Sequence, residues 1–149
     1  MTPPDVGYLR DEIAATPPAS PRDKATAAAK IARGMDAADG AIDSARAAAA
    51  MLQRVGRGKL PIPEEIGIPA LFIARRLQLM ADALAAGEAE PDWNARRAIR
   101  EQASYALKGA AGLVSLLQTD RDARSMFSEA LIQIEQDLLD RAQDLLDVA

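Results

Sequence analysis

Aspartates spaced three and four residues apart are the residues of this sequence whose pattern could support chemistry. They form two stripes, at Asp36, Asp39 and Asp43 and at Asp137, Asp140, Asp144 and Asp147. Carboxylates one helical turn apart can bind Mg²⁺ and, through it, a phosphate. A small all-helical Mg²⁺-dependent nucleotide hydrolase, or a ligand-binding protein that uses these stripes, is therefore an alternative function. Because both stripes lie beside or opposite the apolar positions of their helices, we favour solvated faces and assign no metal ligand.

The absence of cysteine and histidine limits the chemistry further. It excludes disulfides, thiolate nucleophiles, Ser-His and Cys-His pairs, and zinc-finger or histidine-bridged di-iron sites. The sequence also contains no glycine-rich phosphate loop and no nucleophile elbow. We therefore expect no catalytic residue and no cofactor, and favour a protein that is not an enzyme.

Arg96, Arg97 and Arg100 are candidates for contacting an anion, since they are spaced to share one side of a helix. The chain as a whole has a net charge of −4, and residues 119–149 carry eight acidic against three basic side chains. No helix-turn-helix motif is present, and an acidic terminal helix does not suit a protein that coats a polyanion. We expect no binding of nucleic acid.

Apolar residues at alternating steps of three and four predict four long helices, at residues 22–55, 69–86, 91–118 and 120–148. Proline or a capping residue marks each start, at Pro21, Pro69, Pro91 and Thr119, and Gly56 and Gly87 mark two of the ends. The predicted fold is all-α, a bundle of four long antiparallel-type helices over residues 21–149. A flexible proline-rich arm precedes it at residues 1–20, in which Val6, Leu9 and Ile13 are spaced for a short helix.

The predicted buried stripes are rich in alanine, above all in the first and third helices. We expect these two helices to pack as a close pair, with Gly109 and Gly112 adding to the small surface of the third. The stripes are Ala28, Ile31, Met35, Ala38, Ile42, Ala45, Ala49 and Leu52; Ala70, Ile73, Leu77, Met80 and Leu84; Ile99, Ala103, Ala106, Ala110, Leu113 and Leu117; and Phe127, Leu131, Ile134, Leu138, Leu145 and Val148.

The second and fourth helices carry apolar residues that a single stripe does not use. Left exposed together, these residues would form a patch large enough to be a liability for a soluble monomer. Either Val6, Leu9 and Ile13 of the arm fold back over it, or a second copy covers it about a two-fold axis, and we favour the second copy. The predicted function is a non-enzymatic helical interaction module, an adaptor or small regulator that acts through helix–helix contacts as a homodimer or with a protein partner. The predicted interaction surface is Leu71, Phe72, Leu79, Ile132, Leu139 and Leu146.

A lipid- or granule-surface protein is a third alternative, because alanine-rich amphipathic helices are typical of such proteins. The polar face of the strongest amphipathic segment is acidic, however, and membrane-surface helices usually carry Lys and Arg there. The amino end has no signal-peptide pattern, and the most apolar run, residues 67–74, is too short to span a bilayer. We therefore expect a cytoplasmic protein with no membrane span. Abundant alanine, with fourteen Arg against four Lys, suggests a bacterial source.

Overall fold

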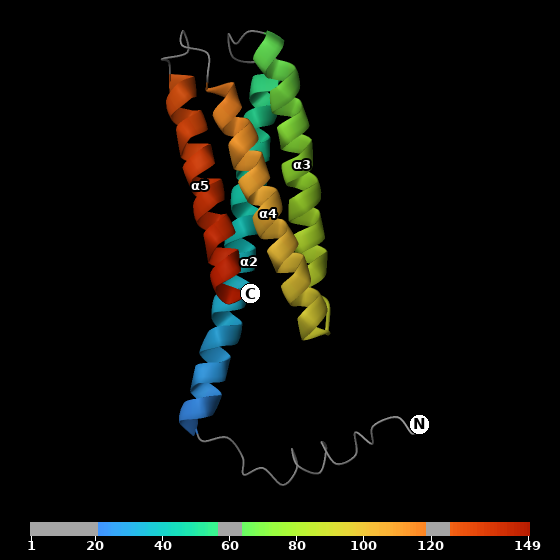
Figure 1. Cartoon of the computed structure of the whole chain (residues 1–149), viewed down its shortest axis with the longest axis vertical. Coiled ribbons are helices and arrows are strands. Elements are labelled where there is room, and N and C mark those ends of the chain that lie inside the picture. The colour runs from blue at the N-terminus through green and yellow to red at the C-terminus, as the bar shows by residue number, and fades with distance from the viewer. Residues whose placement is uncertain (1–20, 57–63, 119–125) are drawn as a thin grey trace, which may run out of the picture. The chain divides into compact units, whose positions relative to one another are not determined.

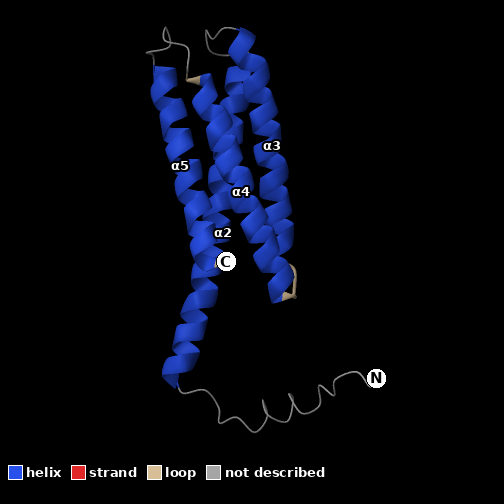
Figure 2. Ribbon diagram, viewed as in Figure 1, coloured by secondary structure: helices blue, strands red, loops and turns tan. Residues whose placement is uncertain are grey.

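The structure is a computed structural model that describes residues 21–56, 64–118 and 126–149. The described residues form four helices, α2 (Pro21–Gly56), α3 (Glu64–Glu88), α4 (Trp93–Leu117) and α5 (Met126–Val148), and no strand (Figures 1 and 2). This confirms the predicted all-α class. None of these described helices is both long and apolar enough to cross a bilayer. The predicted arm, residues 1–20, lies outside the described residues.

The chain divides into two compact units, residues 1–31 and residues 32–149, which are considered separately. In the first unit the described part is the opening of α2, residues 21–31, where every side chain is exposed. The prediction that Ala28, Ile31 and Met35 are buried is wrong, because Ile31 is 61% exposed, Met35 is 53% exposed and Ala28 is exposed too. At 36 residues α2 is longer than the other described helices, which have 25, 25 and 23 residues, so its apolar stripe is longer than a bundle with them can bury.

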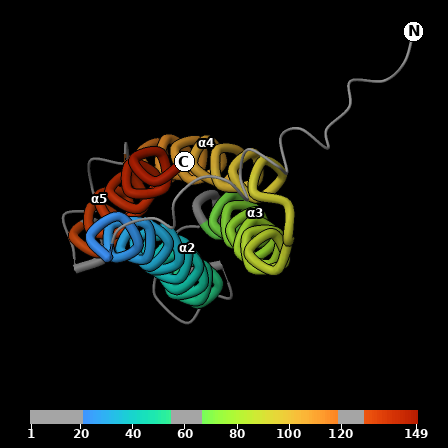
Figure 3. Tube along the Cα trace, turned by 90° about the horizontal axis from the view of Figure 1, so that it is seen from below, coloured from blue at the N-terminus to red at the C-terminus, as the bar shows by residue number. Residues whose placement is uncertain are grey.

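In the second unit the helices run alternately up and down, as short connections between antiparallel neighbours require (Figure 1). Seen along the bundle, α4 lies between α3 and α5, and α2 lies across from α4 (Figure 3). Arg46 of α2 pairs with Asp82 of α3, and Ser44 of α2 accepts a hydrogen bond from Arg141 of α5, so α2 contacts both of its neighbours. The order around the bundle is therefore α2, α3, α4, α5.

The core is built from leucines that pack against an alanine face. On α2, alanines fill most buried positions, whereas α3, α4 and α5 contribute all but one of the largest fully buried side chains, the exception being Leu52 of α2. Large against small side chains allow helices to interdigitate at the close packing typical of protein interiors. The buried alanines of α2 are Ala37, Ala38, Ala41, Ala45, Ala48 and Ala49, and the fully buried leucines are Leu52, Leu77, Leu84, Leu107, Leu131, Leu138 and Leu145.

Helix boundaries agree with the prediction at α2, but α3 begins earlier than expected. It starts at Glu64, so Pro69 lies inside the helix rather than opening it. Pro69 is the sixth residue of α3, where proline removes one backbone hydrogen bond and its ring crowds the carbonyl four residues earlier. The start of α4 is one residue past Asp92, whose carboxylate accepts a hydrogen bond from the backbone N–H of Asn94 at 3.2 Å. The predicted start of the last helix, residues 119–125, lies outside the described residues.

The buried side of α4 is rotated from the predicted stripe. Leu107 and Val114 are fully buried, and Ala106, which we expected in the core, is exposed. A rotation that buries Leu and Val removes more apolar area from water than one that buries alanine. The predicted close pairing of the first and third helices is therefore wrong. A Cβ built on Gly109 or Gly112 would meet no atom within 4 Å, so neither glycine contacts α2.

Two glycines of α2 instead receive arginine side chains from other helices. Arg100 of α4 lies against Gly34, where an added Cβ would be 2.7 Å from its Nη1. Arg141 of α5 lies against Gly40 in the same manner, again at 2.7 Å, and its Nε donates to Ser44 Oγ at 3.1 Å. The missing side chains therefore make room for guanidinium groups at the edge of the core.

Replacing these glycines with alanine tests this arrangement. Gly→Ala in a helix interior normally stabilises by about 1 kcal/mol. We expect that gain for Gly109→Ala, which adds a Cβ in open space. For Gly34→Ala we expect net destabilisation, because Arg100 is buried and must move. Thermal unfolding of both variants measures the two effects. An equal rise in Tm would show that Gly34 does not make room for Arg100.

A second prediction concerns the buried ion pair beside Gly34. Arg100 Nη2 and Nε donate to the two carboxylate oxygens of Glu88 at 2.7 and 2.8 Å, and the two side chains are 9% and 18% exposed. Glu88→Ala leaves a buried charge unpaired, which we expect to cost about 3–5 kcal/mol. The control is Glu101→Ala, which removes the exposed i,i+4 pair with Arg97 and should cost about 0.5 kcal/mol or less. Similar denaturant midpoints for the two variants would show that the buried pair contributes no more than a surface pair.

Candidate interaction surface on α3 and α4

The aspartate stripes lie on two separate helices, α2 and α5, and all of their members are exposed. Among the described residues, no three carboxylates are grouped so that they could hold a metal ion. Asp137 and Asp144 flank Arg141, with an oxygen of each 3.8 Å from its guanidinium nitrogens. Nothing in this geometry favours the hydrolase alternative.

The three arginines proposed to contact an anion do not converge on one site. Arg100 is buried in its pair with Glu88, so its prediction as an accessible anion contact is wrong. Arg97 pairs with Glu101 at 3.3 Å, and its guanidinium carbon lies 5.5 Å from the ring centre of Trp93. Arg96 has a buried Nε without a hydrogen-bond partner. Two of the three arginines are therefore engaged in ion pairs, Arg100 with Glu88 and Arg97 with Glu101.

The predicted interaction residues are all at least partly exposed. Phe72, Leu79, Ile132, Leu139 and Leu71 are 57%, 53%, 46%, 40% and 38% exposed, and Leu146 is half-buried. Leu79 lies on the side of α3 that faces α4, since both line one hollow with Ala106. Leu139 lies one turn from Glu135 and Ala142, the residues of α5 that bind Gln118 and Ser104 of α4. Leu79 on α3 and Leu139 on α5, which sequence analysis assigned to one surface, therefore lie on opposite sides of α4.

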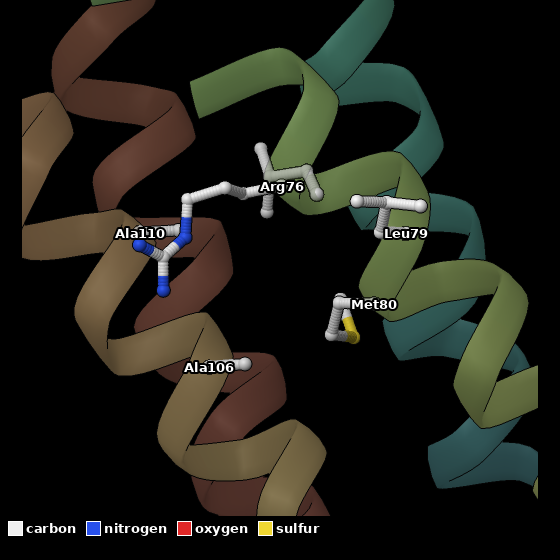
Figure 4. A pocket seen from close by; sticks show the side chains of 6 residues that line it. Arg76, Leu79, Met80, Ala106 and Ala110 are labelled. Carbon is white, nitrogen blue, oxygen red and sulfur yellow. The ribbon is translucent and has the colours of Figure 1, made fainter. Parts of the chain in front are cut away.

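Between α3 and α4 the surface is hollowed into an apolar groove. Two hollows of about 170 Å³ each share Met80 and Ala106, so they form one trough, part of which Figure 4 shows. For comparison, a cavity of about 150 Å³ in a protein core can hold benzene. We call this trough the α3–α4 groove. It is lined by Arg76, Leu77, Leu79, Met80, Ala83 and Leu84 of α3 and by Ile99, Gln102, Ala103, Ala106 and Ala110 of α4.

Small residues on α4 create the groove, and sequence analysis missed this role. Ala106 and Ala110 offer only methyl groups opposite Leu79 and Met80, so the space between the helices stays open (Figure 4). Gly109, one turn from Ala106, leaves the outer edge open as well. The available signal was a pair of mid-helix glycines in an alanine-rich segment, which we interpreted as a contact within the bundle.

One cation, Arg76, lines the groove. In Figure 4 its side chain extends from α3 toward Ala110 of α4. Its guanidinium carbon is 5.7 Å from the ring centre of Phe72, one turn earlier on α3, a distance at which a cation–π attraction operates. The groove is thus apolar along its floor, with a positive charge toward the end nearest Phe72.

A metal test addresses the aspartate stripes directly. A ligand that binds the folded state alone must raise thermal stability. We expect millimolar Mg²⁺ or Mn²⁺ to leave Tm unchanged, since the described carboxylates form no cluster. A saturable rise in Tm that Asp140→Asn abolishes would contradict this and restore the hydrolase alternative.

The features available for assigning a function are therefore the α3–α4 groove, its cation and the apolar rows that border α4. Comparisons with protein-family models, with curated protein sequences and with solved structures found no match.

Proposed function

We propose that this chain is a non-enzymatic interaction module that binds a helix of another protein molecule in the α3–α4 groove. The supporting observation is the groove itself, an uncovered apolar trough between α3 and α4. Helix-in-groove binding places the apolar side chains of an amphipathic helix into such a trough. An adaptor or small regulator that acts by helix–helix contact has this property.

The exposed side chains around the groove support the same proposal. Phe72 and Leu79 are more than half exposed, and Tyr105 and Leu116 on the outer side of α4 are 66% and 65% exposed. Contiguous apolar surface on a soluble domain commonly marks a binding site, and aromatic residues are enriched where partners bind. Gly109 adds to this, because an exposed mid-helix glycine costs about 1 kcal/mol that no contact within the described residues offsets. Close approach of a partner helix would offset it.

Binding of a designed helix tests the proposal. The probe is an 18-residue amphipathic helical peptide with a leucine row and uncharged polar flanks. The fluorophore is attached to one end of the peptide, so the protein surface around the groove stays unchanged. We expect a saturable change in fluorescence, weakened at least about tenfold by Leu79→Glu, because a carboxylate in the apolar contact costs more than about 1.4 kcal/mol.

Leu139→Glu on α5 is the matched control. Leu139 is similarly exposed and carries the same change, but it does not line the groove. We expect it to bind the labelled peptide as the unsubstituted protein does. If the peptide does not bind, or if both variants weaken it equally, the groove is not the binding site and the proposed function fails.

A further inference from the structure

The charges around the α3–α4 groove indicate what kind of helix it takes. Arg76 lines the groove, and Arg75 beside it is exposed. The carboxylates of α3 and α4 with described side chains pair with other arginines: Asp82 with Arg46, Glu88 with Arg100 and Glu101 with Arg97. Within the described side chains, no carboxylate lies within ion-pair distance of Arg76.

Covering the groove would take Arg76 out of water. A charge that loses its hydration needs a partner of opposite sign, and an unpaired buried cation opposes binding strongly. Arg76 projects from α3 over Ala110 of α4, so an occupant lying along the trough passes beside its guanidinium (Figure 4). An occupant with a carboxylate at that position can form an ion pair with Arg76, whereas an occupant without one leaves the guanidinium unpaired.

Groove-against-groove contact with a second copy lacks the required charge. A two-fold dimer of this form would bring two Arg76 side chains together, and neither groove contributes a carboxylate. Such a dimer would bury two cations without a counter-ion. The charges therefore oppose this form of the homodimer and favour an occupant that brings its own carboxylate.

We propose that the α3–α4 groove binds an acidic amphipathic helix of a partner protein, with a carboxylate of that helix paired to Arg76. This inference rests on the proposed function and adds the chemical class of the partner. Two apolar side chains of the helix enter the two hollows that meet at Met80 and Ala106. The carboxylate lies beside that apolar row at the end of the groove nearest Phe72, and it sets the direction in which the helix lies.

Peptides of opposite charge test the partner class. Two further peptides keep the leucine row of the uncharged probe, but one carries Glu and the other Lys beside that row. With the fluorophore on the peptide and at low salt, we expect the Glu peptide to bind at least about tenfold more tightly than the Lys peptide. Arg76→Glu should reverse this order. The control Arg33→Glu changes the net charge equally at an exposed site on α2 and should preserve it.

The outcomes separate this inference from the proposed function. If the uncharged, Glu and Lys peptides bind equally, the groove binds helices but the acidic class is wrong. If the order is the same in Arg76→Glu and Arg33→Glu, net charge and not Arg76 selects the peptide, which overturns the inference. If sedimentation shows a dimer that Arg76→Glu and Leu79→Glu dissociate, a second copy occupies the groove and the inference again fails. If no peptide binds, both proposals fail.

Discussion

The buried ion pair between Arg100 and Glu88 lies on the same side of α4 as Leu107 and Val114, the side that faces the bundle core. Arg100 lies at the margin of the buried stripe, where a charged side chain needs a partner and room for its guanidinium. Glu88 at the end of α3 supplies the partner, and Gly34 on α2 supplies the room. Through Arg100, α4 therefore contacts both α3 and α2 at the same height in the bundle. With Arg100 held inward, Leu107 and Val114 enter the core along the same side of α4.

The groove is a consequence of that rotation. When α4 buries Leu107, the residue before it in sequence turns outward, so Ala106 borders solvent and α3. Leucine at this position would have covered Met80, whereas alanine leaves the trough open. The stability of the fold and the shape of its surface thus depend on one feature, the direction in which α4 presents its small side chains. Because Ala106 is not part of the buried core, an occupant can contact it in the groove without disturbing the packing of the bundle.

The spacing of apolar residues was sufficient to predict the helices and the all-α class, because every long helix must bury one side. Local boundary signals were less exact: Pro91 lies two residues before α4, whose cap is Asp92, and Pro69 lies inside α3. The rotation of α4 was not predictable in this way. Its alanines and leucines form two possible buried stripes about one residue apart. The stripe that is buried includes Arg100, which Glu88 and Gly34 of other helices accommodate. Gly34 and Gly109 look alike in sequence, yet one receives an arginine and the other lies in open space.

At the candidate site, too, features of a single helix were predictable from the sequence, whereas features that depend on contacts between helices were not. Sequence analysis found the exposed rows of α3 and α5 because a surplus of apolar residues on one helix is a local property. It could not find the groove, which exists only where Leu79 and Met80 meet Ala106. Nor could it separate Arg76 from the arginines that pair within the bundle, since only tertiary packing shows which carboxylates are occupied. In such a groove the apolar floor supplies affinity for any amphipathic helix, and the single cation supplies discrimination among them.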